Sequence, residues 1–202
     1  MLYGILKPVV KAFLWRLFRI QVEGVERIPS QGPAILAANH VSWVDAILVA
    51  ALADRPVYFV AKQELFRIPV LGFILRRVYL LEARRDGRDQ AVLRRALQAL
   101  REGNLVGLFP EGHRSRTGRL QEARGGAALL ALHAAAPVVP VGVSGADQVY
   151  EKGWFWHRRP VRVLVGHPVD LGGRRIGRVG REEIAEASGR IMGAISSLLE
   201  AM

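Results

Sequence analysis

Short apolar runs alternate with segments of helical periodicity along most of the chain. Runs of about four to eight apolar residues are typical of buried strands, whereas apolar residues spaced three and four apart indicate helices. The pattern predicts strands at 33–38, 57–61, 78–81, 105–109, 138–143 and 161–165. It predicts helices at 42–53, 63–75, 89–101, 126–133 and 182–199. This alternation indicates a single α/β domain with a mixed sheet flanked by helices.

The first 21 residues have a different pattern. A helix is predicted at 8–20, because Pro8 suits a first helical turn. Lys11, Trp15, Arg16 and Arg19 lie mainly on one side of it, and the other side is apolar, with Val9, Val10, Phe13, Leu14, Leu17 and Phe18. This pattern is typical of a helix in a membrane surface, although a helix packed on its own domain has the same period. We expect residues 1–21 to form a membrane-association helix and residues 22–202 to form the domain.

The net charge of the chain indicates which kinds of binding partner to expect. The chain has 29 Lys and Arg against 18 Asp and Glu, and the resulting net charge of +11 favours an anionic partner. Nucleic-acid-binding proteins usually combine basic residues with a recognised motif or with aromatic platforms. Here the aromatic residues gather mainly near the N-terminus and at 154–156. We therefore expect an anionic membrane surface or a phosphate-bearing substrate, and no nucleic acid.

The apolar N-terminus is not predicted to span a membrane. A span needs about 20 nearly uncharged residues, and Lys7, Lys11, Arg16 and Arg19 interrupt this segment. No signal peptide is predicted, since no apolar core runs into a small-residue cleavage site. We expect a peripheral, monotopic protein on the cytoplasmic face of a membrane. The chain has no cysteine, which excludes disulfides and thiolate chemistry, and no metal site is expected.

A histidine and a carboxylate stand five residues apart where a predicted strand gives way to a helix, in the segment NHVSWVD at 39–45. Ser42 and Asp45 also fit an N-terminal helix cap, which would make Asp45 structural. That interpretation leaves Asn39 and His40 unexplained. With His40 in the turn and Asp45 on the first helical turn, one ring nitrogen can donate to the carboxylate while the other accepts a proton.

A second polar segment, FPEGHRSR at 109–116, also follows a predicted strand. A tight turn followed by a solvated basic stretch accounts for Arg116 and Arg119. For Arg114 we expect a function, because a guanidinium just past a strand end can hold a phosphate through two N–H groups. Glu111 is expected to orient Arg114 or the head group of a substrate.

Together these segments resemble the glycerolipid acyltransferase family, which includes 1-acyl-glycerol-3-phosphate acyltransferase. The family pattern is Asn-His-x-x-x-x-Asp followed by Phe-Pro-Glu-Gly-x-Arg-Ser, and both parts are present in order. A block from Lys62 to Arg85 and the segment 139–141 resemble further family motifs, so that the resemblance spans residues 22–170. The chain departs from the pattern at His113, where threonine is commoner, and at Ala123, where phenylalanine is common.

The resemblance implies direct transfer of a fatty acyl group from acyl-CoA or acyl carrier protein to the hydroxyl of lysophosphatidic acid, with no cofactor and no acyl-enzyme. It implies that His40 is the general base and that Asp45 orients it. The acceptor's phosphate and glycerol would contact Glu111, Arg114, Lys62 and Arg85. The wall of the acyl-donor site would include Val139, Pro140 and Val141.

Three other functions fit parts of the sequence. A transferase for another lysophospholipid or an amino-acid lipid would use the same residues. A serine hydrolase of lipid esters would need Ser144 or Ser42, although Ala146 replaces the second glycine of a nucleophile elbow around Ser144. A non-catalytic, basic membrane-binding module would explain the charge and leave both polar segments to coincidence.

Overall fold

The computed structural model describes residues 2–62, 67, 79–83, 90–115, 117–147, 160–172 and 177–202. Within these residues seven strands form one sheet, in the order β1-β7-β6-β2-β5-β3-β4. Strands β2 to β6 pair in parallel, whereas β7 is antiparallel to β6 and β1 is parallel to β7. The predicted mixed sheet is confirmed. The strands are Gln21–Glu23 (β1), Ala34–Ala38 (β2), Val57–Lys62 (β3), Leu80–Ala83 (β4), Leu105–Leu108 (β5), Val138–Ser144 (β6) and Arg162–Val165 (β7).

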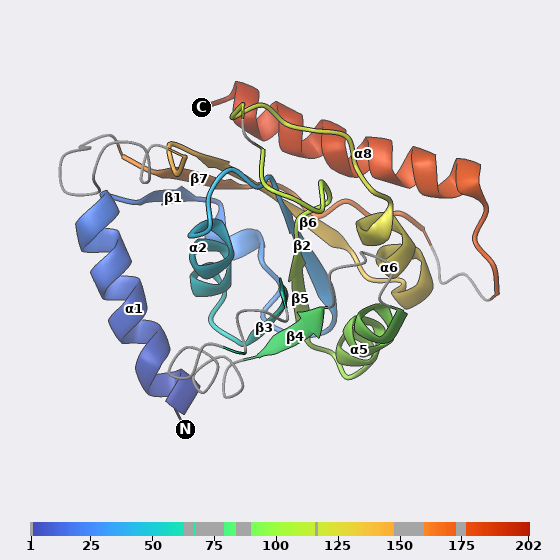
Figure 1. The fold of residues 1–202 in the computed structure, drawn as a ribbon, viewed down its shortest axis with the longest axis horizontal. Helices are drawn as coiled ribbons and strands as arrows, with labels where there is room; N and C mark the ends of the chain where they lie inside the picture. The colour runs from blue at the N-terminus through green and yellow to red at the C-terminus, as the bar shows by residue number, and fades with distance from the viewer. Residues whose placement is uncertain are drawn as a thin grey trace.

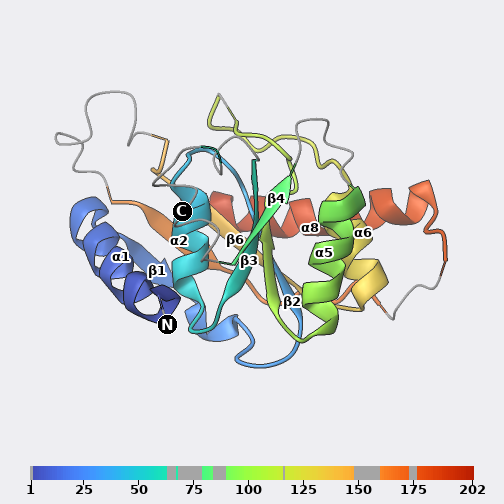
Figure 2. The ribbon, with the colours of Figure 1, turned by 60° about the horizontal axis from the view of Figure 1, so that its bottom comes forward.

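Helices cover both faces of this sheet (Figure 1). One face carries α1 (Leu2–Phe18) and α2 (Asp45–Leu52), which contact each other. The other face carries α5 (Gln90–Arg101), α6 (Gly126–Ala134) and α8 (Arg181–Glu200). A 3-10 turn, η1 (Val25–Arg27), follows β1. Figure 2 shows the sheet between these two groups of helices from another direction. The predicted arrangement, a sheet flanked by helices, is therefore confirmed.

Strand β2 lies at the centre, and all five of its residues are buried. Its side chains alternate between the two cores: Leu36 belongs to the core beneath α1 and α2, and Ile35 to the core beneath α5, α6 and α8. A strand buried on both faces has to be apolar throughout, as residues 34–38 are. Because β2, β3 and β5 are parallel, their carboxyl ends meet at one edge, where ligands of open α/β sheets usually bind.

Helix α1 differs from the prediction in length and in orientation. It begins at Leu2, so that Pro8 lies inside the helix and the helix forgoes one backbone hydrogen bond there. The predicted apolar face divides in two: Leu14 and Phe18 are buried against the domain, while Val9 and Phe13 are 62% and 57% exposed. The helix therefore packs on its own domain and still presents an apolar pair outward.

One further difference concerns a short strand. β1 has only three residues and was not predicted, because so short a strand shows no alternation and depends on pairing with β7. The helix predicted at 63–75, apart from residue 67, and the aromatic segment 154–156 lie outside the described residues. No helix in the described part of the chain is both long and apolar enough to cross a membrane.

Candidate active site

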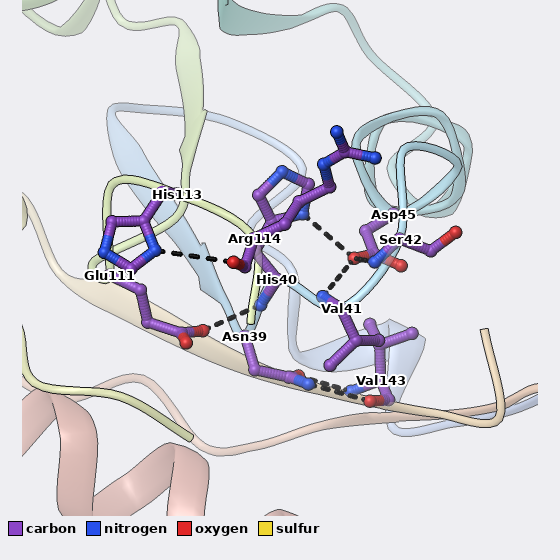
Figure 3. A network of polar contacts seen from close by, with 9 residues as sticks. All are labelled: Asn39, His40, Val41, Ser42, Asp45, Glu111, His113, Arg114 and Val143. Carbon is purple, nitrogen blue, oxygen red and sulfur yellow. Dashed lines mark hydrogen bonds and ion pairs between the residues drawn. The ribbon is translucent and has the colours of Figure 1, made fainter. Parts of the chain in front are cut away.

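His40 and Asp45 are joined by a hydrogen bond at the carboxyl end of β2 (Figure 3). His40 lies in the turn and Asp45 is the first residue of α2, and Nδ1 of His40 is 3.0 Å from Oδ2 of Asp45. Because the carboxylate accepts this hydrogen bond, Nδ1 carries a proton, and in the neutral imidazole Nε2 then has the lone pair. Asp45 is completely buried, whereas the His40 side chain is 17% exposed. Buried Asp45 therefore holds His40 from the interior of the domain, and the His40 ring remains accessible to a substrate.

Oδ2 of Asp45 also organises the turn itself. It accepts the backbone N–H groups of Val41 at 2.7 Å and Ser42 at 2.6 Å. The side chain of Ser42 caps nothing: its Oγ is buried and has no hydrogen-bond partner among the described residues, and α2 begins at Asp45. The alternative interpretation, a helix cap through the Ser42 side chain, therefore finds no contact, and the helix predicted from residue 42 begins at Asp45. The contact runs instead from the Ser42 backbone to Asp45.

Glu111 joins the second polar segment to the first. Its side chain is 1% exposed, and Oε1 accepts the backbone N–H of His40 at 2.8 Å while Oε2 accepts that of Gln121 at 3.1 Å. Burial raises the pKa of Glu111, and the two N–H donors act in the opposite direction. The N–H of Ser115 donates to the carbonyl of His40 at 2.7 Å. Both backbone polar groups of His40 are thus held by residues 111–115.

Asn39, which the sequence left unexplained, connects β2 to β6. Its Nδ2 donates to the carbonyl of Val143 at 2.8 Å, and its Oδ1 accepts the N–H of the same residue at 2.7 Å. Asn39 is buried, so both hydrogen bonds form away from water. The residue before the candidate base is therefore fixed to a neighbouring strand.

An aromatic ring supports the imidazole from one face. The rings of His40 and Phe109 are stacked, with centroids 3.8 Å apart and planes 7° from parallel. The sequence pattern alone indicates no function for Phe109, because an aromatic residue at the end of an apolar run resembles ordinary core. Only its place directly before Pro110 and Glu111 could have pointed to this contact.

Arg114 is exposed beside the pair, and Figure 3 shows its guanidinium group and Nε2 of His40 pointing in the same direction. Hydrogen bonds join His40, Asp45 and Glu111 in one cluster, and Arg114 directly precedes Ser115, whose N–H donates to the His40 carbonyl. Such a cluster can take a proton from a hydroxyl group while a cation holds a nearby anion.

The other predicted site residues are placed less directly. Lys62 ends β3 at the same edge of the sheet, but its side chain is outside the described part, as is the whole of Arg85. Val139, Pro140 and Val141 lie in β6 and are buried in the sheet. The two valines contribute to the core beneath α1 and α2 and present no surface to a ligand. The roles of these residues stay predictions.

The serine-hydrolase alternative finds no matching contact. Within the described residues, no hydrogen bond joins His40 to Ser42 or to Ser144, and Ser144 is exposed at the end of β6. The described residues also contain no group of three side chains suited to hold a metal ion.

Comparison with known proteins places this geometry in a family. Residues 19–144, more than half of the chain, match the model of the family described as Acyltransferase. The chain belongs to the acyltransferase family. The acyltransferase match includes both polar segments, 39–45 and 109–116, and β2, β3, β5 and β6.

Three acyltransferase relatives have informative names. A chloroplastic 1-acyl-sn-glycerol-3-phosphate acyltransferase of Arabidopsis thaliana is 30% identical over 77% of this chain and 45% of its own length. The 1-acyl-sn-glycerol-3-phosphate acyltransferase of Bacillus subtilis is 27% identical over 74% of this chain and 73% of its own length. The crystal structure of the 1-acyl-sn-glycerophosphate acyltransferase PlsC from Thermotoga maritima superposes with a TM-score of 0.73 and is 28% identical, covering 93% of this chain and 75% of that one. This chain spans about half the length of its plant relatives.

Asn39→Ala is expected to destabilise the protein, because it leaves a buried N–H and a buried carbonyl of Val143 without partners. The free energy of unfolding should fall by about 1–3 kcal/mol, measured by urea denaturation. Asn104→Ala is the matched control, since the Asn104 side chain makes no hydrogen bond with the described residues. Equal stability of the two variants would contradict this account of Asn39.

Proposed function

We propose that this chain transfers a fatty acyl group from a thioester to the free hydroxyl of lysophosphatidic acid, which gives phosphatidic acid. The observation that carries the proposal is the hydrogen bond between His40 and buried Asp45, with Arg114 beside it. The relatives in Arabidopsis, Bacillus and Thermotoga support the choice of acceptor, since each is named for acylation of this lysolipid.

In the proposed reaction Nε2 of His40 removes the proton from the acceptor hydroxyl as its oxygen attacks the thioester carbonyl carbon. The new C–O bond produces a tetrahedral intermediate, and its collapse breaks the C–S bond. The departing thiolate takes the proton back from the imidazolium, so that no group on the protein is consumed. Asp45 stabilises the imidazolium through Nδ1, as a buried carboxylate does in other general-base systems.

Arg114 is proposed to bind the phosphate of the acceptor, because its guanidinium is exposed on the side to which Nε2 points. Lys62 and Arg85 are proposed as further phosphate contacts. For Glu111 we now favour an indirect function: both its oxygens accept backbone N–H groups and its side chain is buried, so that it holds His40 in place for the acceptor.

The donor is proposed to be acyl-CoA or acyl carrier protein, both of which are anionic and would suit a chain of net charge +11. No cofactor is needed for transfer between a thioester and an alcohol. Val139, Pro140 and Val141 are proposed to line the acyl-donor site, which requires them to become accessible from their buried positions in β6.

We further propose that α1 seats the protein on the cytoplasmic face of an anionic membrane. Its exposed Val9 and Phe13 supply apolar contact, and exposed Arg16, with exposed Arg19 directly after the helix, supplies charge. The neighbouring helix α2 adds exposed apolar side chains, Trp43 just before its first residue and Ile47 one turn on. A lipid acceptor would thus reach His40 without leaving the surface.

His40→Ala should reduce the formation of phosphatidic acid by about 10²–10⁴-fold, because the proposed general base for the hydroxyl proton is lost. The assay supplies an acyl thioester and lysophosphatidic acid and detects the product by mass spectrometry. His167→Ala, which changes an exposed histidine after β7, is the control and should stay at the wild-type rate. Near-normal turnover by a folded His40→Ala variant would overturn the mechanism.

Arg114→Ala should raise the KM for lysophosphatidic acid by about tenfold or more, since a charge-assisted hydrogen bond to phosphate is lost. Monoacylglycerol, which lacks the phosphate, should be acylated at a nearly unchanged rate. Arg119→Ala, which removes an exposed arginine five residues further along the chain, should change neither the KM for lysophosphatidic acid nor the rate with monoacylglycerol. If Arg114→Ala lowers the acylation of both acceptors equally, Arg114 has another function. A panel of other lysolipids then identifies the preferred acceptor.

Replacing Val9 and Phe13 together by serine should weaken binding to phosphatidylglycerol vesicles by about tenfold or more, because burial of these side chains in lipid is lost. Binding is measured by co-sedimentation. Val25→Ser is the matched control, since Val25 is an apolar residue of η1 that is 41% exposed. Unchanged binding of the double variant would argue against α1 as the membrane contact.

A further inference from the structure

We propose that Phe109 is a positioning residue for His40, and that its ring sets the plane of the imidazole and therefore the direction of Nε2. The rings are stacked with centroids 3.8 Å apart and planes 7° from parallel. The inference rests on the proposed function, because the direction of Nε2 matters for catalysis only if Nε2 takes the proton of the acceptor hydroxyl.

The hydrogen bond to Asp45 cannot orient the imidazole by itself. It restrains the distance between Nδ1 and Oδ2 of Asp45, and joint rotation about the two side-chain bonds of His40 can still tilt the ring while that distance changes little. Such a tilt would move Nε2, on the far side of the ring, away from the acceptor hydroxyl. Contact with a flat aromatic face opposes the tilt, because a tilted ring would either collide with Phe109 or separate from it. Proton transfer requires Nε2 and the hydroxyl oxygen of the acceptor to lie within hydrogen-bond distance, so that a small displacement of Nε2 lowers the reaction rate.

Phe109 is itself supported from within the sheet. Its ring contacts that of Phe59, with centroids 5.7 Å apart and planes at 39°, and Phe59 is almost completely buried. Phe59 is paired in register with Gly107 across β3 and β5. A Cβ at Gly107 would lie 2.2 Å from Cε2 of Phe59, so that the ring fits only over a glycine. The strands thus hold Phe59, and Phe59 limits the movement of Phe109.

An aromatic ring at this position also suits the charge that develops on His40. When Nε2 accepts the proton, the imidazole becomes a cation whose face lies against Phe109. The face of a benzene ring is electron-rich and attracts a cation, most effectively where water is excluded. A leucine of similar hydrophobicity would fill part of the space but would supply neither the flat surface nor this attraction.

The test compares Phe109→Leu with Phe109→Tyr in the full chain, using lysophosphatidic acid and an acyl thioester. Phe109→Leu should lower kcat by about tenfold, the scale of a lost desolvated cation–aromatic contact, and leave the KM for lysophosphatidic acid within about twofold. Phe109→Tyr keeps the ring and should retain most of kcat. Ile195→Val, in the core on the opposite face of the sheet, controls for a general loss of packing and should keep kcat.

A nuclear magnetic resonance measurement tests the stacking separately from activity. The His40 ring protons should show a ring-current shift that disappears in Phe109→Leu and persists in Phe109→Tyr, while the signals of the other four histidines stay in place. If the wild-type protein transfers no acyl group, the proposed function fails, and the ring-current shift still decides whether Phe109 orients His40. If the wild-type protein is active but Phe109→Leu keeps its kcat, or Phe109→Tyr is equally impaired, the positioning role is overturned.

Discussion

One oxygen atom, Oδ2 of Asp45, determines the geometry of the candidate active site. Three donors converge on it: Nδ1 of His40 and the backbone N–H groups of Val41 and Ser42. A buried carboxylate without such partners would be costly, so that the turn after β2 is stable only when it closes around Asp45. The contacts to Oδ2 therefore also place Nδ1 of the imidazole, while Oδ1 of the same carboxylate is buried and has no hydrogen-bond partner among the described residues. The structure of the turn and the proposed chemistry therefore both depend on the contacts to Oδ2 of Asp45, so that a substitution of Asp45 would affect both.

The turn is also tied to two neighbouring strands, which makes the site a property of the whole sheet. Asn39 holds the Val143 backbone of β6, while Glu111 and Ser115, in the segment after β5, hold the two backbone polar groups of His40. Because β2, β5 and β6 are parallel, their carboxyl ends lie together and these contacts are short. A rigid sheet beneath a catalytic turn limits reorganisation during proton transfer, which is where preorganised sites gain most of their effect.

The sequence was sufficient for those parts of the fold that have local causes. The central strands and the helices α5, α6 and α8 follow from apolar runs and helical spacing, and the two polar segments stand out because each follows an apolar strand. Contacts between distant segments could not be predicted in this way. Phe109 looks like a core residue until His40 is placed against it, and Glu111 looks like a ligand for substrate until its burial is known. β1 likewise depends on pairing with β7, a strand from the other end of the chain.

Helix α1 shows why one hydrophobic pattern had two interpretations. A helix with a single apolar face can bury it either against its own domain or in a membrane. Helix α1 instead buries Leu14 and Phe18 against the domain, while Val9 and Phe13 face outward. Helix α5, on the opposite face of the sheet, has the usual pattern of a helix packed on its own domain. Its buried side is apolar, and exposed Arg94 and Arg95 lie on its outer side. The outward apolar side chains of α1 and α2 therefore lie on one side of the sheet, and the turn that carries His40 leads directly into α2. On that arrangement, packing α1 against the domain fixes its outer side relative to the candidate base, so that docking on a lipid surface would also orient the site.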